Sequence, residues 1–219
     1  MIYRAERDQV LEAARRCVTQ GLTHGTSGNV SLRLATGFAV TPSGLDYAEA
    51  GREDIVVLDD SGIPLAGERR VPSSEWPMHA RIYQTRVEVR AIVHGHSPAA
   101  TALACLGRDV PPIHYMIAIA GGDSIRCAPY RPFGTDDLAR VAVEALTDRK
   151  ACLLAHHGFL AVGESLQEAL SVAAETEFLA DLYLRLLPLG DPPLLSREAI
   201  ADALARFAGY GQPRHLPSS

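Results

Sequence analysis

The chain has 219 residues, of which 47% are hydrophobic and 21% are charged, as in an ordinary globular protein of one domain. Its formal net charge of −5 argues against a nucleic-acid partner, because such proteins usually carry a basic patch. No apolar run reaches the roughly 20 residues of a membrane span, and the charged first residues do not form a secretory signal. Four widely spaced cysteines without a C-x-x-C pair predict free thiols and a cytoplasmic location.

The first half of the chain predicts a helix, three short strands and a second helix. Apolar residues recur at helical spacing near the start, at Val10, Leu11, Ala14, Val18 and Leu22. Ser73 or Ser74 is expected to cap the second helix, with Pro77 in its first turn. The expected elements are a helix over 4–22, strands at 29–34, 37–41 and 54–59, and a helix over 73–86.

The second half of the chain alternates strands with helices. Ser97 and Pro98 are typical of a helix start, and Ser196 is expected to cap the last helix. The expected elements are a strand at 89–96, a short helix from 97, an irregular stretch over 121–135, a helix over 136–147, a strand at 150–158, and helices over 165–187 and 196–211. Short strands with inserted helices indicate an α+β or layered α/β/α domain with a mixed or mainly antiparallel sheet.

Two of the predicted strands end in histidine pairs. Residues i and i+2 of a strand share a face, so His94 and His96 are expected to point into one space. Adjacent strand residues face opposite sides, so only one of His156 and His157 can join them. Three imidazoles leave a coordination position open, as in catalytic zinc sites, and Glu75 would be a fourth ligand or a base. Isolated histidines are more often structural than metal ligands, which is the expectation for His24, His79 and His215.

Three turns combine small residues, hydroxyl groups and backbone N–H groups. They are GTSGN at 25–29, TPSG at 41–44 and SSE at 73–75. Such turns can hold a phosphate without Lys or Arg, because backbone amides and helix N-termini carry partial positive charge. None of them matches a Walker or dinucleotide-binding motif, and each alone is equally typical of an ordinary turn or cap.

Eight motifs follow one another along nearly the whole chain: GLTHGTSGNVSLR, FAVTPSGLDY, PSSEWPMH, VHGHS, IHYMIA, GGDSI, APYRPFGT and LLAHHG. In this order they resemble the class II aldolase/adducin family. The resemblance implies one three-layer α/β/α domain over 1–219 with a central, mainly antiparallel sheet and a mobile tail over 205–219. It further implies a ring-shaped homotetramer whose active sites lie between subunits.

The resemblance also implies a reaction and its residues. The reaction is zinc-dependent, reversible aldol cleavage of a ketose 1-phosphate, L-fuculose 1-phosphate or a similar sugar, into dihydroxyacetone phosphate and a short aldehyde such as lactaldehyde. Zinc would be held by His94, His96 and His157, with Glu75 beside the metal as general acid/base. Tyr115 would act at the aldehyde oxygen in a neighbouring subunit. The remaining implied positions are Gly28, Asn29, Ser43, Gly44, Ser73 and Ser74 for the phosphate, and Phe133, Phe207 and Tyr210 for the aldehyde side.

Other activities use the same family pattern. They are a pentulose 5-phosphate 4-epimerase, a methylthioribulose 1-phosphate dehydratase and a non-catalytic adducin-like scaffold. Tyr115 and the FAGYG tail favour the aldolase, and the retained histidines argue against the scaffold. His24, Arg131 and Pro132 depart from the pattern beside the binding motifs, where they would affect which aldehyde is accepted.

Overall fold

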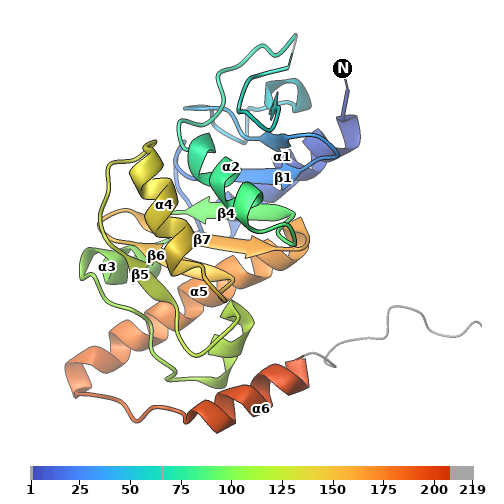
Figure 1. Ribbon diagram of the computed structural model, residues 1–219. Helices are drawn as coiled ribbons and strands as arrows, with labels where there is room; N and C mark the ends of the chain where they lie inside the picture. The colour runs from blue at the N-terminus through green and yellow to red at the C-terminus, as the bar shows by residue number, and fades with distance from the viewer. Residues whose placement is uncertain (1, 66, 208–219) are drawn as a thin grey trace, which may run out of the picture.

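The computed structural model describes residues 2–65 and 67–207, whose strands form one sheet (Figure 1). The strand order is β3-β2-β1-β4-β7-β6-β5, and of these neighbours only β5 and β6 run parallel. The strands are β1 (Asn29–Arg33), β2 (Phe38–Val40), β3 (Val56–Leu58), β4 (Ala91–Gly95), β5 (Arg126–Ala128), β6 (Ala151–Leu154) and β7 (Gly158–Gly163). The predicted mainly antiparallel sheet is therefore confirmed.

Helices cover both faces of this sheet. The α-helices are α1 (Arg4–Thr19), α2 (Trp76–Thr85), α3 (Pro98–Cys105), α4 (Asp136–Ala145), α5 (Leu166–Leu186) and α6 (Arg197–Phe207). The described residues also form the short 3-10 helices η1 (Arg52–Asp54), η2 (Tyr115–Ala120) and η3 (Leu187–Leu189). Figure 1 shows α2 and α4 in front of the strands and α5 behind them, while α6 lies across the lower end against η2.

Side-chain alternation along the strands produces two separate cores. On β4, Val93 packs into a core that includes Leu103 of α3 and Ala173 of α5, whereas Ile92 packs into a core with Ile82 of α2 and Leu138 of α4. Burial on both sides explains why the central strands are apolar at nearly every position. The predicted three-layer arrangement is confirmed.

The predicted strand over 150–158 is wrong in its second half. Strand β6 ends at Leu154, and the chain turns through His156, whose φ is 55°, before β7 begins at Gly158. His156 and His157 therefore lie on a turn, and strand alternation does not decide which of them points inward. The apolar run after Gly158 is the central strand β7, which the sequence did not reveal, and β5 lies within the stretch expected to be irregular.

The second helix also begins later than predicted. Glu75, not Ser73 or Ser74, is the N-cap residue of α2. Ser73 still contributes, because its Oγ accepts a hydrogen bond from the Glu75 N–H at 3.3 Å. The expected cap of the last helix is present, since Ser196 Oγ accepts from the Ala199 N–H at 3.2 Å.

Two expectations concern the chain's environment. All four cysteines are free thiols, with Cys17 and Cys152 buried, Cys127 half-buried and Cys105 exposed. Within the described ranges, no helix combines the length and apolar character that crossing a bilayer requires.

A polar cluster lies buried between β1 and α2. Ser31 Oγ lies 2.6 Å from His79 Nδ1 and 2.7 Å from Tyr83 Oη. Burial, together with the nearby His94, lowers the pKa of His79 to about 3. His79 is therefore neutral at pH 7 and hydrogen-bonded within the fold, as expected of a structural histidine.

This cluster makes stability depend on pH. Unfolded histidine has a pKa of about 6.5, so between pH 6.5 and 3 the unfolded chain binds a proton that folded His79 does not. The free energy of unfolding therefore decreases as the pH is lowered through this range. We expect the metal-free protein to lose about 1.5 kcal/mol more free energy of unfolding than H79Q between pH 6.5 and 5. Urea unfolding in the presence of a chelator measures the difference. Parallel curves for the two proteins would contradict it.

Candidate functional site

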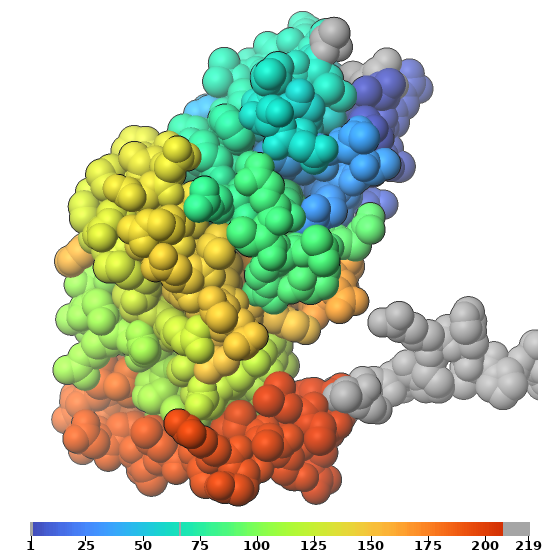
Figure 2. Space-filling view, viewed as in Figure 1, coloured from blue at the N-terminus to red at the C-terminus, as the bar shows by residue number. Residues whose placement is uncertain are grey.

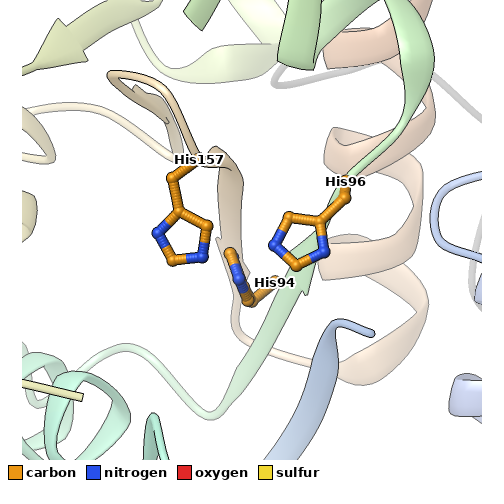
Figure 3. Close-up of side chains that lie close together, drawn as sticks. All are labelled: His94, His96 and His157. Carbon is orange, nitrogen blue, oxygen red and sulfur yellow. The ribbon is translucent and has the colours of Figure 1, made fainter. Parts of the chain in front are cut away.

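Three histidine side chains converge at the end of β4. His94 lies on β4, His96 follows it directly, and His157 lies on the turn between β6 and β7. Their ligand nitrogens all lie within 4.8 Å of one another. Figure 3 shows the three rings facing a common space from these two segments. Of the pair at 156–157, only His157 takes part.

The carboxylate of Glu75 faces the same space from the start of α2. One of its oxygens lies 3.0 Å from His94 Nε2 and the other lies 3.3 Å from His157 Nε2. Asn29, the register partner of His94 on β1, donates through Nδ2 to Glu75 Oε2 at 3.0 Å. The side chains that meet here thus come from β1, β4, α2 and the β6–β7 turn.

The ring orientation of His94 is fixed by a backbone contact. Nδ1 lies 2.8 Å from the carbonyl oxygen of Phe159, which can only accept, so Nδ1 carries the proton. In the neutral ring, Nε2 then presents a lone pair to a Glu75 oxygen at 3.0 Å. Two electron-pair donors at this distance repel unless a proton or a cation lies between them. Nδ1 donation to a carbonyl is also how proteins orient histidines for metal binding.

Charge states in the site favour a cation. Burial and the neighbouring His94 lower the pKa of His96 to about 3 and that of His157 to about 4, so both rings are neutral at pH 7. Although burial opposes ionisation of Glu75, the adjacent His94 and His157 and the Asn29 amide hold its pKa well below the ordinary value. Although burial opposes it, the Glu75 carboxylate raises the pKa of His94, so this pair favours a positive charge between them. A bound metal would take the place of that proton, because a carboxylate and neutral imidazoles are the protonation states in which these groups bind metals.

Several buried atoms in the site have no hydrogen-bond partner among the described residues. They are Asn29 Oδ1, Glu75 Oε1, His94 Nε2 and His96 Nε2. Leaving buried polar atoms unpaired costs about 1–3 kcal/mol each. A cation among these donors would satisfy most of them at once. A set of imidazole nitrogens with one carboxylate fits a divalent transition ion, with zinc favoured.

A cavity of about 370 Å³ opens beside the histidines. Its walls include all six residues expected at the phosphate and also Glu75, His96, His157 and Phe133. The other lining residues also lie within the motifs of the sequence: Thr26, Ser27, Pro42, Tyr130, Arg131 and His156. Of these, only His156, as one of a histidine pair, and Arg131, as a departure from the family pattern, stood out in the sequence. The three small-residue turns are therefore parts of one cavity.

Gly28 is needed where the first of these turns meets β4. Its φ is 74°, and a Cβ atom there would lie 2.8 Å from the carbonyl oxygen of His94. Glycine alone combines this conformation with such an approach. The turn that leads into Asn29 can therefore pack directly against the backbone of a histidine in the site.

Two expected site residues lie elsewhere in the same chain. Tyr115 begins η2, is 53% exposed, and stacks its ring on Phe207 of α6 with centroids 6.0 Å apart. Neither residue lines the cavity. Figure 2 shows α6 as a ledge along the lower end of the molecule. Tyr210 and most of the expected mobile tail lie outside the described residues.

The histidine turn provides a matched test of the cluster. We expect H157N to weaken zinc binding by more than about a hundredfold, because it removes a ligand, whereas H156N should bind zinc like the wild type. Asn tolerates the positive φ of position 156, so this control should fold normally. Competition with a chromophoric chelator measures both affinities. Equal zinc affinities for H157N and H156N would exclude the proposed ligand set.

Comparison with known proteins identifies the family. The chain matches the model of the class II aldolase and adducin N-terminal domain over residues 8–184. A 5-methylthioribulose-1-phosphate/5-deoxyribulose-1-phosphate aldolase of Rhodospirillum rubrum is 46% identical, over 98% of this chain and 96% of the relative. An L-fuculose phosphate aldolase of Escherichia coli is 45% identical over 93% and 94%. A solved L-fuculose 1-phosphate aldolase superposes with a TM-score of 0.91 at 39% identity, over 95% of this chain and 98% of that one. The chain therefore belongs to the class II aldolase and adducin family and is a class II aldolase.

Proposed function

We propose that this aldolase reversibly cleaves a ketose 1-phosphate into dihydroxyacetone phosphate and a short aldehyde. One observation carries the proposal: His96 and His157 of the histidine cluster, together with Glu75, line the same cavity as three turns rich in hydroxyls and amides. The relatives are named for aldolase activity on L-fuculose phosphate and on 5-deoxyribulose or 5-methylthioribulose 1-phosphate. These phosphorylated ketoses define the substrate class.

The histidines would hold the metal, which we propose to be zinc. His94, His96 and His157 would bind one cation, whose charge supplies Lewis-acid stabilisation of the negative charge that develops on the three-carbon fragment. Because His96 and His157 have pKa values of about 3 and 4, these rings would be neutral and leave the cation its full charge.

Glu75 is the proposed general acid/base. Its side chain is buried, ionised and directed at the histidines, and it lines the cavity. A carboxylate in this position can exchange a proton with the carbon that was bonded to the aldehyde. Asn29 holds the carboxylate through Oε2, which leaves Oε1 directed toward His157.

The small-residue turns would hold the phosphate. Ser43, Ser73 and Ser74 offer hydroxyl groups, and Gly28, Asn29 and Gly44 add a short side chain and backbone amides to the same walls. Binding the end of the substrate that does not react aligns the bond that breaks and lowers the entropic barrier. At the other end, Phe133 would contact the aldehyde portion, with Phe207 and Tyr210 from the segment 205–219.

Product analysis tests the activity. The zinc-loaded protein should release dihydroxyacetone phosphate from L-fuculose 1-phosphate, 5-deoxyribulose 1-phosphate or 5-methylthioribulose 1-phosphate, as detected by its enzymatic reduction. The substrate with the highest kcat/KM identifies the preferred aldehyde. Formation of an epimer of a pentulose 5-phosphate, or of a dehydrated methylthioribulose 1-phosphate, without aldehyde release would replace the proposed reaction by the alternatives in the same family.

Replacing Glu75 separates its acid/base role from metal binding. We expect E75Q to lose about a hundredfold or more in kcat, because the amide cannot exchange a proton. The three histidines should keep zinc in this variant, and metal analysis of the same sample verifies it. E144Q, on the exposed side of α4, is the matched control and should keep wild-type kcat. A zinc-loaded E75Q with unchanged kcat would rule out the acid/base role.

We also propose that the chain forms a homotetramer in the cytoplasm, with active sites shared between subunits. The support is that the exposed Tyr115 and the half-buried Phe207 stack on each other away from the cavity of their own chain. A neighbouring subunit would bring Tyr115 to the aldehyde oxygen. The free thiols suit a reducing compartment.

Mixed oligomers test this sharing. E75Q and Y115F should each be nearly inactive as pure proteins. When they are refolded together at equal amounts, a site with Glu75 from one chain and Tyr115 from its neighbour is intact, so about a quarter of the sites should recover activity. Light scattering checks that the oligomers have re-formed. If Tyr115 acted within its own chain, the mixture would stay inactive.

A further inference from the structure

We propose that Arg131 binds the phosphate group of the substrate, an inference that rests on the proposed function. Arg131 lines the same cavity as Ser43, Ser73 and Ser74. Among the described lining residues, Arg131 alone carries a permanent positive charge. The only other charged lining residue apart from histidines is Glu75, which is negative. The hydroxyl-rich turns offer partial positive charge from their backbone amides, but none of their side chains carries a full positive charge to balance the phosphate.

The guanidinium of Arg131 has no carboxylate partner among the described residues. Nη1 of Arg131 donates a hydrogen bond to the carbonyl oxygen of the preceding Tyr130 at 2.6 Å. Arginine offers five N–H donors, so most of them are left for a ligand. By contrast, Arg7, Arg149 and Arg185 form ion pairs with acidic side chains.

The loop that carries Arg131 lines the cavity between the β6–β7 turn, which carries His156, and the turn at 73–75. At one end, the Tyr130 ring lies edge-on to the His156 ring, with centroids 6.1 Å apart. At the other end, Gly134 approaches Ser74 so closely that an added Cβ would lie 3.0 Å from its carbonyl oxygen. Arg131 lies between these two anchors.

Local chemistry holds this loop in place. Pro132 restricts the backbone of Arg131 to extended conformations. The hydroxyl of Thr135 donates to the carbonyl oxygen of Pro132 at 2.7 Å and accepts from the Leu138 N–H as the cap of α4. A loop that is already held in place loses less conformational entropy when its side chain binds an anion.

Charge balance favours the phosphate over the sugar as the partner of Arg131. A phosphate monoester carries about −2 and Glu75 carries −1, so a divalent cation alone would leave the cavity negative when substrate is bound. Arg131 brings this sum close to zero. The aldehyde portion of the proposed substrates has no charge, so the Arg131 guanidinium would gain little electrostatic attraction by lying there.

The test measures phosphate binding apart from catalysis. Inorganic phosphate is titrated by calorimetry into zinc-loaded and chelator-treated full-length protein, so that phosphate bound by the metal is separated from phosphate bound by the chain. R131A should bind phosphate about tenfold more weakly in both forms, and R131K should be intermediate because it keeps the charge but loses the planar fork. R81A removes an exposed charge from α2 and should bind as wild type does.

Kinetics then locate the contact on the substrate. R131A should raise KM for the ketose 1-phosphate about tenfold, while kinetics with the corresponding unphosphorylated ketose stay unchanged. Unchanged phosphate affinity in a folded R131A overturns the proposal, as does a variant that changes only the preference among aldehydes. Phosphate binding that depends on Arg131 in a protein that cleaves no ketose phosphate would support the inference and refute the proposed function separately.

Discussion

The close approach of the β6–β7 turn to the end of β4 is the constraint on which the site depends. A Cβ atom on Gly158 would lie 2.3 Å from the carbonyl oxygen of Gly95 and 2.5 Å from the ring of His96. Only a residue without a side chain fits between these groups, and this spacing brings His157 to the histidines of β4. Gly95 is equally confined, since its own Cβ would lie 2.4 Å from the carbonyl oxygen of Leu22. Two glycines therefore determine how closely the imidazoles can gather.

Sheet order brings distant parts of the chain to this point. Strands β1, β4 and β7 are neighbours in the sheet. Along the chain, however, β2, β3 and α2 separate β1 from β4, and α3, β5, α4 and β6 separate β4 from β7. Asn29 on β1 is therefore beside His94 on β4 and holds Glu75 at the start of α2. The carbonyl of Phe159 on β7 orients His94 from the other side. The ionised carboxylate and the oriented ring are thus consequences of strand pairing.

The sequence predicted the regular parts well and the tertiary contacts poorly. Alternation along β4 placed His94 and His96 together because that strand is regular to its end. The same rule gave no valid reason for His157, because a turn replaces the expected strand there. Strand β7 was missed because its short apolar run follows the histidines directly and leads into the cap of α5 at Ser165. Arg131 was noted only as a departure from a motif, since its place on the cavity wall depends on contacts between loops.

The histidine cluster and the rest of the cavity wall lie on different kinds of structural element, so substitutions can affect them separately. His94 lies on a strand, and His96 and His157 lie directly beside strand ends, whereas much of the cavity wall belongs to loops around 26–28, 42–44 and 130–133. Substitutions in such loops reshape the wall without repacking the two cores that hold the sheet together. Substitutions at the rim can thus change which molecules fit the cavity while the histidine cluster keeps its geometry.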